Sequence, residues 1–273
     1  MYSVIIPSYN RCSVLPHAID SVLLQNYHPL EIIVIDDGSD DDTAQMLAQK
    51  YPEVRYLYQE NRGPAAARNR GIQVARGNTI AFLDSDDIWL AGKIKREQQF
   101  FKLFNNADML AGNATSFLSG KLRHADTFAQ RQIQFHQQQP RYFDWTINIM
   151  LQGPVCCTSA MTFKKNTLDK LGNKPFDERL RLNEDWDLEF RVFSQSRVLL
   201  YPQIHCHRHI FDDGTRHFYS IPGKKKSAQE QLRNDIQQQQ IIARYLNSSN
   251  WDNATRQRFF QQHQQLNPQH QPA

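Results

Sequence analysis

The chain has 273 residues, of which 40% are hydrophobic and 22% are charged. These values are typical of a globular protein and exclude disorder throughout, and the length suits one large α/β domain with a tail. The net charge of +4 is small, and the basic residues are scattered apart from the run Lys224-Lys225-Lys226, so we expect no nucleic-acid partner.

The first hundred residues alternate short apolar runs with amphipathic segments. We expect strands at 2–6, 31–35, 54–58 and 79–83, and helices at 14–25, 43–50 and 65–75. The last of these helices opens with Pro64, a residue suited to a first turn. This alternation predicts an α/β fold with a Rossmann-like, mostly parallel sheet flanked by helices.

The second part of the chain is less regular. We expect a helix at 90–104, strands at 108–115, 159–163 and 198–201, and helices at 165–171 and 185–194, with a polar excursion over 119–142 that is variable or mobile. From residue 227 the sequence is rich in glutamine, and Leu232, Ile236, Ile241, Tyr245 and Leu246 indicate amphipathic helices. The residues after about 266 are expected to be disordered.

Three acidic clusters carry most of the functional information. Asp36-Asp37 and Asp84-Ser85-Asp86-Asp87 each follow an expected strand, and Glu184-Asp185 comes later. Ligands of open α/β sheets bind beyond the carboxyl ends of strands, so the first two clusters indicate a metal ion and a polar ligand. Simpler interpretations stay open, since Asp and Gly also form tight turns and acidic residues also begin helices.

The sequence also bears on location and on redox chemistry. Four cysteines show no spacing typical of a disulfide framework or a zinc site, which favours free thiols. The N-terminal residues do not resemble a signal peptide, and no apolar run approaches the ~20 residues of a spanning helix. We therefore expect a cytoplasmic protein.

Five motifs in one order resemble the signatures of family 2 glycosyltransferases, which have the GT-A fold. They cover roughly residues 2–201 and are Val4-Ile5-Ile6-Pro7-Ser8-Tyr9-Asn10, Ile35-Asp36-Asp37-Gly38-Ser39, Ala65-Ala66-Ala67-Arg68-Asn69-Arg70-Gly71, Phe82-Leu83-Asp84-Ser85-Asp86-Asp87 and Asn183-Glu184-Asp185-Trp186-Asp187-Leu188. The resemblance implies transfer of a sugar from a nucleotide-sugar to an acceptor hydroxyl, with inversion at the anomeric carbon. It implies a GT-A domain over 1–222, with a nucleotide-binding half (1–105) and an acceptor-binding half (106–222). The composition of the remaining residues adds a helical, partly disordered Gln-rich tail (223–273).

The same resemblance assigns residues to the donor and to a metal ion. Asp37 matches the position that contacts the nucleobase, and Arg68 matches a diphosphate-facing arginine, with Arg70 as a rival. The full set for the nucleotide-sugar is Pro7, Tyr9, Asp37, Arg68, Asp84 and Ser85. The expected metal ligands are Asp86, Asp84 and His209, with His207 as an equal rival for the last position.

The expected chemistry explains why carboxylates are needed. An acceptor alcohol is a weak nucleophile, so Asp185 is expected to accept its proton as the general base, with Glu184 supporting it or binding acceptor hydroxyls. A nucleoside diphosphate leaves readily only when its charge is neutralised, and Mn²⁺ or Mg²⁺ held by carboxylate and phosphate oxygens does this.

The resemblance also limits the substrates. UDP-sugars are the expected donors by family frequency, and the acceptor is expected to be a glycan or lipid-linked saccharide in surface polysaccharide assembly. The Gln-x-x-Arg-Trp motif of processive relatives does not occur in the sequence, which favours a non-processive enzyme. Peripheral contact with the inner face of a membrane stays open.

Two other functions also stay open. One is a sugar-phosphate nucleotidyltransferase, although Pro7-Ser8-Tyr9-Asn10 lacks the glycine-rich phosphate loop that such enzymes usually carry after the first strand. The other is a sugar-nucleotide binding module without turnover, which the presence of both Asp86 and Asp185 disfavours.

Overall fold

The structure is a computed structural model that describes residues 1–143, 153–180, 182–210, 237–238, 240–241 and 244. In the first part of the chain the elements are β1 (Tyr2–Ser8), α1 (Leu15–Leu23), β2 (Leu30–Asp36), α2 (Thr43–Lys50), β3 (Arg55–Tyr58), α3 (Pro64–Val74), β4 (Thr79–Phe82), β5 (Ile88–Trp89) and α4 (Lys93–Leu103). They are followed by β6 (Met109–Leu118), β7 (Lys121–His124), α5 (Thr127–Gln130), η1 (His136–Gln138), β8 (Arg141–Tyr142), η2 (Thr158–Ala160), β9 (Met161–Lys164), α7 (Lys165–Asp169), α8 (Glu184–Phe193) and β10 (Val198–Ile210).

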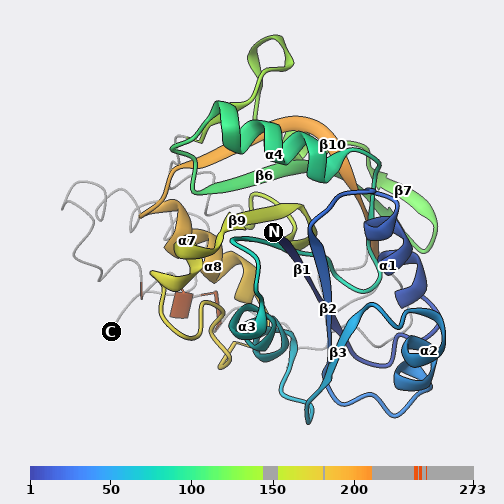
Figure 1. Ribbon diagram of the computed structural model, residues 1–273. Helices are drawn as coiled ribbons and strands as arrows, with labels where there is room; N and C mark the ends of the chain where they lie inside the picture. Colours follow the sequence, from blue (N-terminus) through green and yellow to red (C-terminus); the bar gives the residue numbers. More distant parts are fainter. Residues whose placement is uncertain (144–152, 181, 211–236, 239, 242–243, 245–273) are drawn as a thin grey trace.

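The described strands form one mixed sheet in the order β3-β2-β1-β4-β9-β6-β10-β5 (Figure 1). Pairing is parallel among β3, β2, β1 and β4 and between β6 and β10, as the alternation of strands and helices predicts. Strand β9 lies between β4 and β6 and is antiparallel to both. The expected α/β fold with a central sheet flanked by helices is confirmed.

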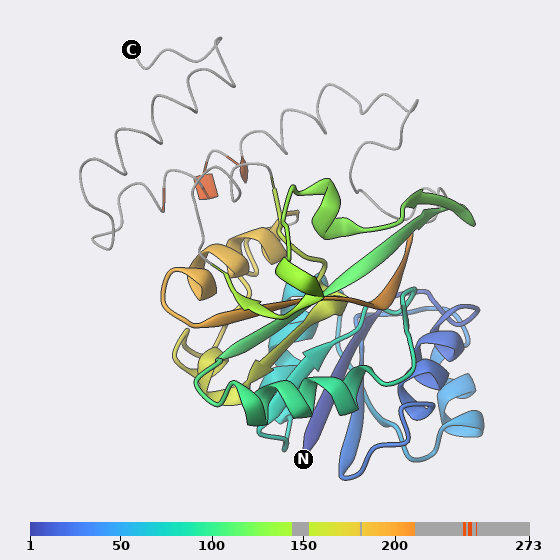
Figure 2. The same ribbon diagram turned by 90° about the horizontal axis from the view of Figure 1, so that it is seen from above.

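Alternating residues of the central strands bury side chains on both faces of the sheet. In β1, Ile5 joins a core cluster with residues of α3 and α8, whereas Val4 and Ile6 join a second cluster with residues of α1 and α2. Figure 2 shows α4 and α8 on opposite sides of the sheet. Because both faces are covered, β1, β2 and β4 appear in the sequence as continuous apolar runs.

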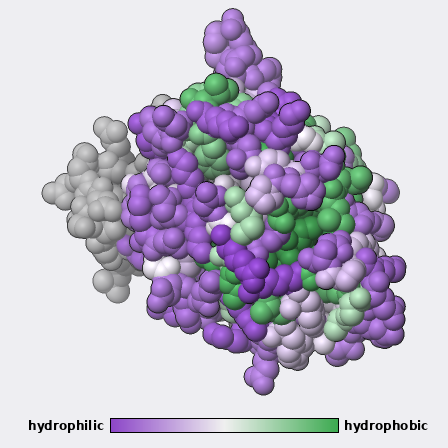
Figure 3. All heavy atoms as spheres, in the orientation of Figure 1, coloured by the Kyte–Doolittle hydropathy of each residue, from purple (hydrophilic) through white to green (hydrophobic). Residues whose placement is uncertain are grey.

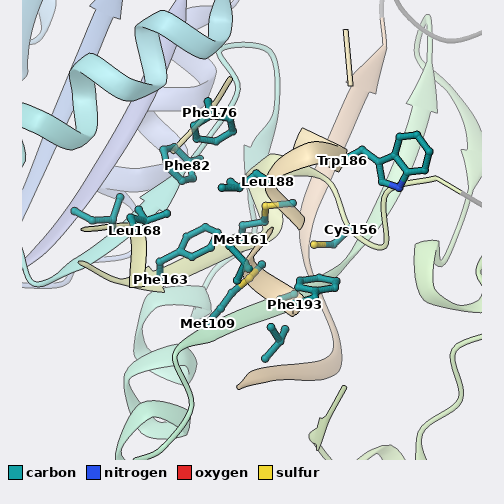
Figure 4. Packing of buried hydrophobic residues seen from close by; sticks show 14 of the residues in the cluster. Phe82, Met109, Cys156, Met161, Phe163, Leu168, Phe176, Trp186, Leu188 and Phe193 are labelled. Carbon is teal, nitrogen blue, oxygen red and sulfur yellow. The ribbon is translucent and has the colours of Figure 1, made fainter. Parts of the chain in front are cut away.

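The larger core cluster connects the sheet to helix α8. The rings of Phe82 and Phe176 meet edge to face, with centroids 5.2 Å apart, and Phe163 packs on Phe82 from β9 (Figure 4). Leu188 lies fully buried on α8 in the same cluster. Helix α8, which begins with Glu184-Asp185, is thus packed in the same core as β4, the strand that precedes Asp84-Ser85-Asp86-Asp87.

Several boundaries differ from those expected from the sequence. Strand β10 extends to Ile210 rather than ending at Tyr201, and it bends through irregularities between Tyr201 and Cys206. Helix α4 begins at Lys93 because residues 88–89 pair with β10. The segment 119–142, expected to be an excursion, contains short elements, and Phe128 is buried in the core.

Most of the glutamine-rich tail lies outside the described residues, as do Leu232, Ile236, Tyr245, Leu246 and the run Lys224-Lys225-Lys226. Of the expected helical positions Ile241 is described, and it is fully buried in the cluster that contains α8. The face seen in Figure 3 is largely hydrophilic, with hydrophobic residues gathered over the region of β1 and β2. None of the helices in the described part of the chain is long and apolar enough to cross a bilayer.

Candidate active site

The first two acidic clusters lie at the same end of the sheet, at the carboxyl ends of the two strands that flank β1. Ser8 of β1 is in register with Asp36 of β2, and β4 pairs with the other side of β1. The backbone N–H of Asp37 donates to the carbonyl of Ser8 (2.8 Å), and that of Leu83 donates to the carbonyl of Ile5 (3.0 Å). The loops after β1, β2 and β4 therefore leave the sheet side by side.

The loop after β2 is held by its own carboxylates. Asp36 accepts hydrogen bonds from the Ser39 backbone N–H (2.9 Å) and from the Tyr56 hydroxyl (2.8 Å). Asp37 accepts from Gln59 Nε2 and from the backbone N–H groups of Arg62 and Gly63 at 2.7–2.9 Å. Burial raises the pKa of Asp37, and these hydrogen bonds oppose the rise. Asp37 thus joins the loop after β2 to the loop that precedes α3.

The loop after β1 lies against the loop after β2. Asn10, with φ of 51°, accepts from the Asp40 backbone N–H and donates its own backbone N–H to Ser39, both at 2.9 Å. Pro7 is buried within β1, whereas Tyr9 is exposed, with 49% of its surface accessible. An exposed aromatic ring at a strand end is available to stack on a planar ligand.

Arg68 connects the second acidic cluster to the third. Its guanidinium donates from Nη2 to Asp84 Oδ1 (2.7 Å) and from Nη1 to Glu184 Oε1 (2.8 Å). The arginine side chain is 5% exposed and lies over the Phe176 ring, 5.3 Å from its centroid. Asp84 remains partly exposed, so the buried arginine lies behind a carboxylate that a ligand can reach.

The acidic loop after β4 forms a closed turn. The Asp87 backbone N–H donates to the Asp84 carbonyl (3.0 Å), and Ser85 and Asp86 lie buried between these two residues. The Asp87 carboxylate accepts from Ser159 Oγ (2.6 Å) and from the His209 backbone N–H (2.9 Å). Burial, with Asp84 nearby, raises the pKa of Asp87 to about 7.

The third cluster begins helix α8. Glu184 is buried, and burial raises its pKa to about 7 although the Arg68 guanidinium opposes the rise. Asp185 is half-buried. Burial also raises the pKa of Asp185, and the Arg68 guanidinium again opposes the rise. Carboxylates with raised pKa values at a helix start, joined through an arginine to a second acidic loop, are suited to accept a proton near neutral pH.

A divalent metal ion fits the chemistry of the acidic loop, although the predicted metal ligands do not form a closed set. Among the residues that the structure describes, no three His, Cys, Asp or Glu side chains gather to hold a metal ion. The ring of His209 stacks on Phe117, at 5.3 Å between centroids, and the His207 ring meets Phe117 edge-on. A hard ion that takes most of its oxygens from phosphate and water needs only one or two carboxylates, which Asp86 and Asp84 offer.

Several residues at the site were not identified from the sequence. Gln59 and Asn69 position their neighbours, Gln59 through Asp37 and Asn69 through the Phe176 backbone. Buried Glu189 accepts from the backbone N–H groups of Val155 (2.6 Å) and Cys156 (2.9 Å), and burial raises its pKa to about 8. No local pattern distinguishes these polar residues, because their partners lie far away in sequence.

Comparison with known proteins connects this geometry to a family. A family model described as glycosyl transferase family 2 matches residues 3–172. An uncharacterized glycosyltransferase of Rickettsia felis is 33% identical over 204 residues, which covers 72% of this chain and 31% of that protein. WfgD of Escherichia coli, named a UDP-Glc:alpha-D-GlcNAc-diphosphoundecaprenol beta-1,3-glucosyltransferase, is 40% identical over 115 residues, which covers 41% of this chain and 45% of WfgD. The chain spans less than two thirds of the length of either relative.

Among solved structures, residues 1–349 of TarS from S. aureus have the same fold. The TM-score is 0.71 at 18% identity, and the match covers 97% of this chain and 72% of that one. The same part of TarS has been solved in complex with UDP and with UDP-GlcNAc.

Proposed function

The chain belongs to glycosyl transferase family 2, and on that basis we propose that it is an inverting, non-processive glycosyltransferase. The observation that carries the proposal is the Arg68 bridge, which joins the acidic loop after β4 to the first turn of α8. One loop would hold the donor diphosphate, and the helix would present the base to the acceptor. Both groups are needed in one site for a single displacement.

In the proposed mechanism, Asp185 removes the proton from the acceptor hydroxyl as that oxygen attacks the anomeric carbon. Its raised pKa makes it a better base than an ordinary aspartate. Glu184 stays bound to Arg68 and keeps the helix start in place. Attack from the face opposite the leaving diphosphate inverts the configuration at the anomeric carbon.

The donor would lie across the strand ends. Tyr9 is exposed there for contact with the base, Asp37 holds the neighbouring loop, and Arg68 offers planar N–H donors suited to phosphate oxygens. Asp86 and Asp84 would hold Mn²⁺ or Mg²⁺ together with phosphate oxygens and water, whereas the rings of His209 and His207 pack on Phe117 and are not part of the proposed ligand set. When bound, the ion neutralises charge that develops on the leaving diphosphate.

The proposed donor is a UDP-sugar, and the proposed acceptor is a hydroxyl of a glycan or lipid-linked saccharide. The names of WfgD and of the TarS complexes support a uridine donor, and the name of WfgD supports a lipid-linked acceptor. We place the reaction in the cytoplasm, where peripheral contact with a membrane would bring the protein to such an acceptor.

The test uses the purified chain with Mn²⁺, a panel of nucleotide-sugars and lipid-linked or glycan acceptors. We expect UDP to bind and one UDP-sugar to be transferred or slowly hydrolysed. Asp185→Asn should lower kcat by about 10²–10⁴-fold, the usual contribution of a general base, while donor affinity stays within about twofold.

The outcomes of this test distinguish glycosyl transfer from nucleotidyl transfer and from binding without turnover. Failure of the wild-type chain to bind UDP, together with absence of donor hydrolysis, would contradict glycosyl transfer. Release of pyrophosphate from a nucleoside triphosphate would identify a nucleotidyltransferase instead. Donor binding with no turnover in either variant would identify a binding module.

A further inference from the structure

Ser159 is a fully buried serine in the middle of the short 3-10 helix η2, next to the acidic loop. Its hydroxyl accepts a hydrogen bond from the Asp84 backbone N–H (3.0 Å) and donates one to Asp87 Oδ2 (2.6 Å). It therefore joins the first and last residues of the loop that holds Asp86. The backbone hydrogen bond from Asp87 to the Asp84 carbonyl also joins these two residues and closes the turn.

The backbone of Ser159 is fixed by β5, and Asp87 is held from a second side by β10. The Ser159 carbonyl accepts from the Trp89 indole Nε1 (2.8 Å), and Trp89 is buried in β5 immediately after the acidic loop. The other oxygen of Asp87 accepts from the His209 backbone N–H of β10 (2.9 Å). The loop is thus held by η2, β5 and β10, and the serine hydroxyl is the point at which the loop and η2 meet.

We infer that Ser159 is a positioning residue, whose hydroxyl holds the acidic loop in the shape that presents Asp84 and Asp86 to the donor diphosphate. The use of the loop for a donor rests on the proposed function, whereas the hold on the loop does not. A hydrogen bond to a carboxylate is stronger than one between neutral groups, so loss of this hydroxyl weakens the loop at both ends. Ser159 itself needs no contact with substrate.

The chain offers a matched control at the other end of the same sheet. Ser3 is also fully buried, and its hydroxyl also bridges a backbone N–H and a carboxylate, accepting from Gly77 (2.8 Å) and donating to Glu31 (2.5 Å). It lies near the amino end of β1, away from the loops at the carboxyl ends of the strands. Ser3→Ala therefore reports the structural cost of losing such a hydroxyl without disturbing the acidic loop.

The experiment compares the wild-type chain, Ser159→Ala and Ser3→Ala. Hydrogen exchange in peptides that cover residues 82–90 should become faster in Ser159→Ala and stay unchanged in Ser3→Ala. By calorimetry, Ser159→Ala should bind UDP in the presence of Mn²⁺ about tenfold more weakly, which corresponds to the loss of one charged hydrogen bond. In kinetics, the donor KM should rise by a similar factor while the acceptor KM stays unchanged, whereas Ser3→Ala should keep both constants.

Unchanged exchange of the loop in Ser159→Ala would overturn the inference, as would equal effects of the two substitutions on UDP binding. If wild-type protein neither binds UDP nor transfers sugar, the proposed function fails, but the exchange data still decide whether Ser159 holds the loop. Should Ser159→Ala not fold, Ser159→Cys replaces it, because the somewhat larger thiol still fills the site but is a weak hydrogen-bond donor.

Discussion

Arg68 shows how one residue sets the charge balance of the candidate site. A buried guanidinium is tolerated because Asp84 and Glu184 both accept its hydrogen bonds, and each carboxylate is stabilised in return. Burial raises the pKa values of Glu184 and Asp185, and Arg68 is the largest influence that opposes this rise. The arginine therefore lowers the pH at which the third acidic cluster becomes ionised, against the larger effect of burial.

Replacing Arg68 should shift the pH dependence of transfer. The base must be ionised to accept a proton, so activity is lost as pH falls through its pKa. Arg68→Gln removes the positive charge that lowers this pKa, and the acidic limb of the kcat profile should move to higher pH. The measurement is kcat between pH 5 and 9 at saturating donor.

Arg70→Gln is the control for this shift. Arg70 lies two residues further along α3, and its guanidinium contacts the Tyr58 carbonyl at an exposed position. The substitution removes an equal charge but leaves the Asp84 and Glu184 contacts in place. A pH profile that moves equally in both variants would show that Arg68 has no specific influence on the base.

The candidate site was predictable from the sequence only in part. The clusters at Asp36–Asp37 and Asp84–Asp87 stood out because they directly follow apolar runs that end in a turn. The roles expected of Asp37, Asp84, Asp86 and Asp185 came from the resemblance to family 2 glycosyltransferases. Ser159 gave no such signal, since it stands in a run that resembles the start of a strand. Its importance comes from contacts with residues more than seventy positions away.

At the scale of elements, prediction succeeded where a strand is buried on both faces. Strands β1, β2 and β4 were expected within three residues of their observed bounds, because their apolar runs are continuous. Strand β10 was not, since Pro202 and alternating histidines follow Tyr201 and resemble a loop. The direction of β9 was not predicted either, because it follows from pairing with both β4 and β6 rather than from local sequence.

The packing of α3 on β1 depends on a glycine. A Cβ atom at Gly71 would come within 2.3 Å of Ile5 Cγ2, too close for any side chain unless the helix moves. Gly71→Ala should therefore lower the free energy of unfolding by about 1–3 kcal/mol, despite the better helix propensity of alanine. Urea denaturation followed by circular dichroism measures this change.

Gln73→Ala tests the same helix at an exposed position. Its side chain contacts only the Asn173 carbonyl among the described hydrogen bonds, at 3.2 Å and in solvent. We expect a change within about 0.5 kcal/mol. A cost for Gly71→Ala no larger than this would show that α3 can move away from β1 without penalty.

At the scale of the molecule, Arg244 connects the C-terminal region to the helix of the proposed base. Its guanidinium donates to Asp187 Oδ1 of α8 and to Asp177 Oδ2, both at 2.7 Å. Asp187 is fully buried, and Ile241 is buried in the same core as α8. The described part of the tail thus packs on helix α8 rather than standing apart from it.

Removing this connection should destabilise the whole molecule. Arg244→Ala deletes two hydrogen bonds to carboxylates, one of them fully buried, and should lower the free energy of unfolding by about 1.5–3 kcal/mol. Urea denaturation measures the loss, with Arg179→Ala as the control, because Arg179 also pairs with Asp177 but is 80% exposed. Equal stability of Arg244→Ala and wild-type protein would show that the contact with α8 contributes nothing.

The position of β9 between β4 and β6 has a consequence for synthesis on the ribosome. Strand β4 is complete at Phe82, but its second neighbour exists only after Lys164 has been translated. At a synthesis rate of roughly 5–20 residues per second, the nascent chain exposes the unpaired edge of β4 for roughly 4–16 seconds. An unpaired strand edge can pair with another molecule and cause aggregation, so a chaperone that binds the nascent chain should prevent aggregation mainly during that interval.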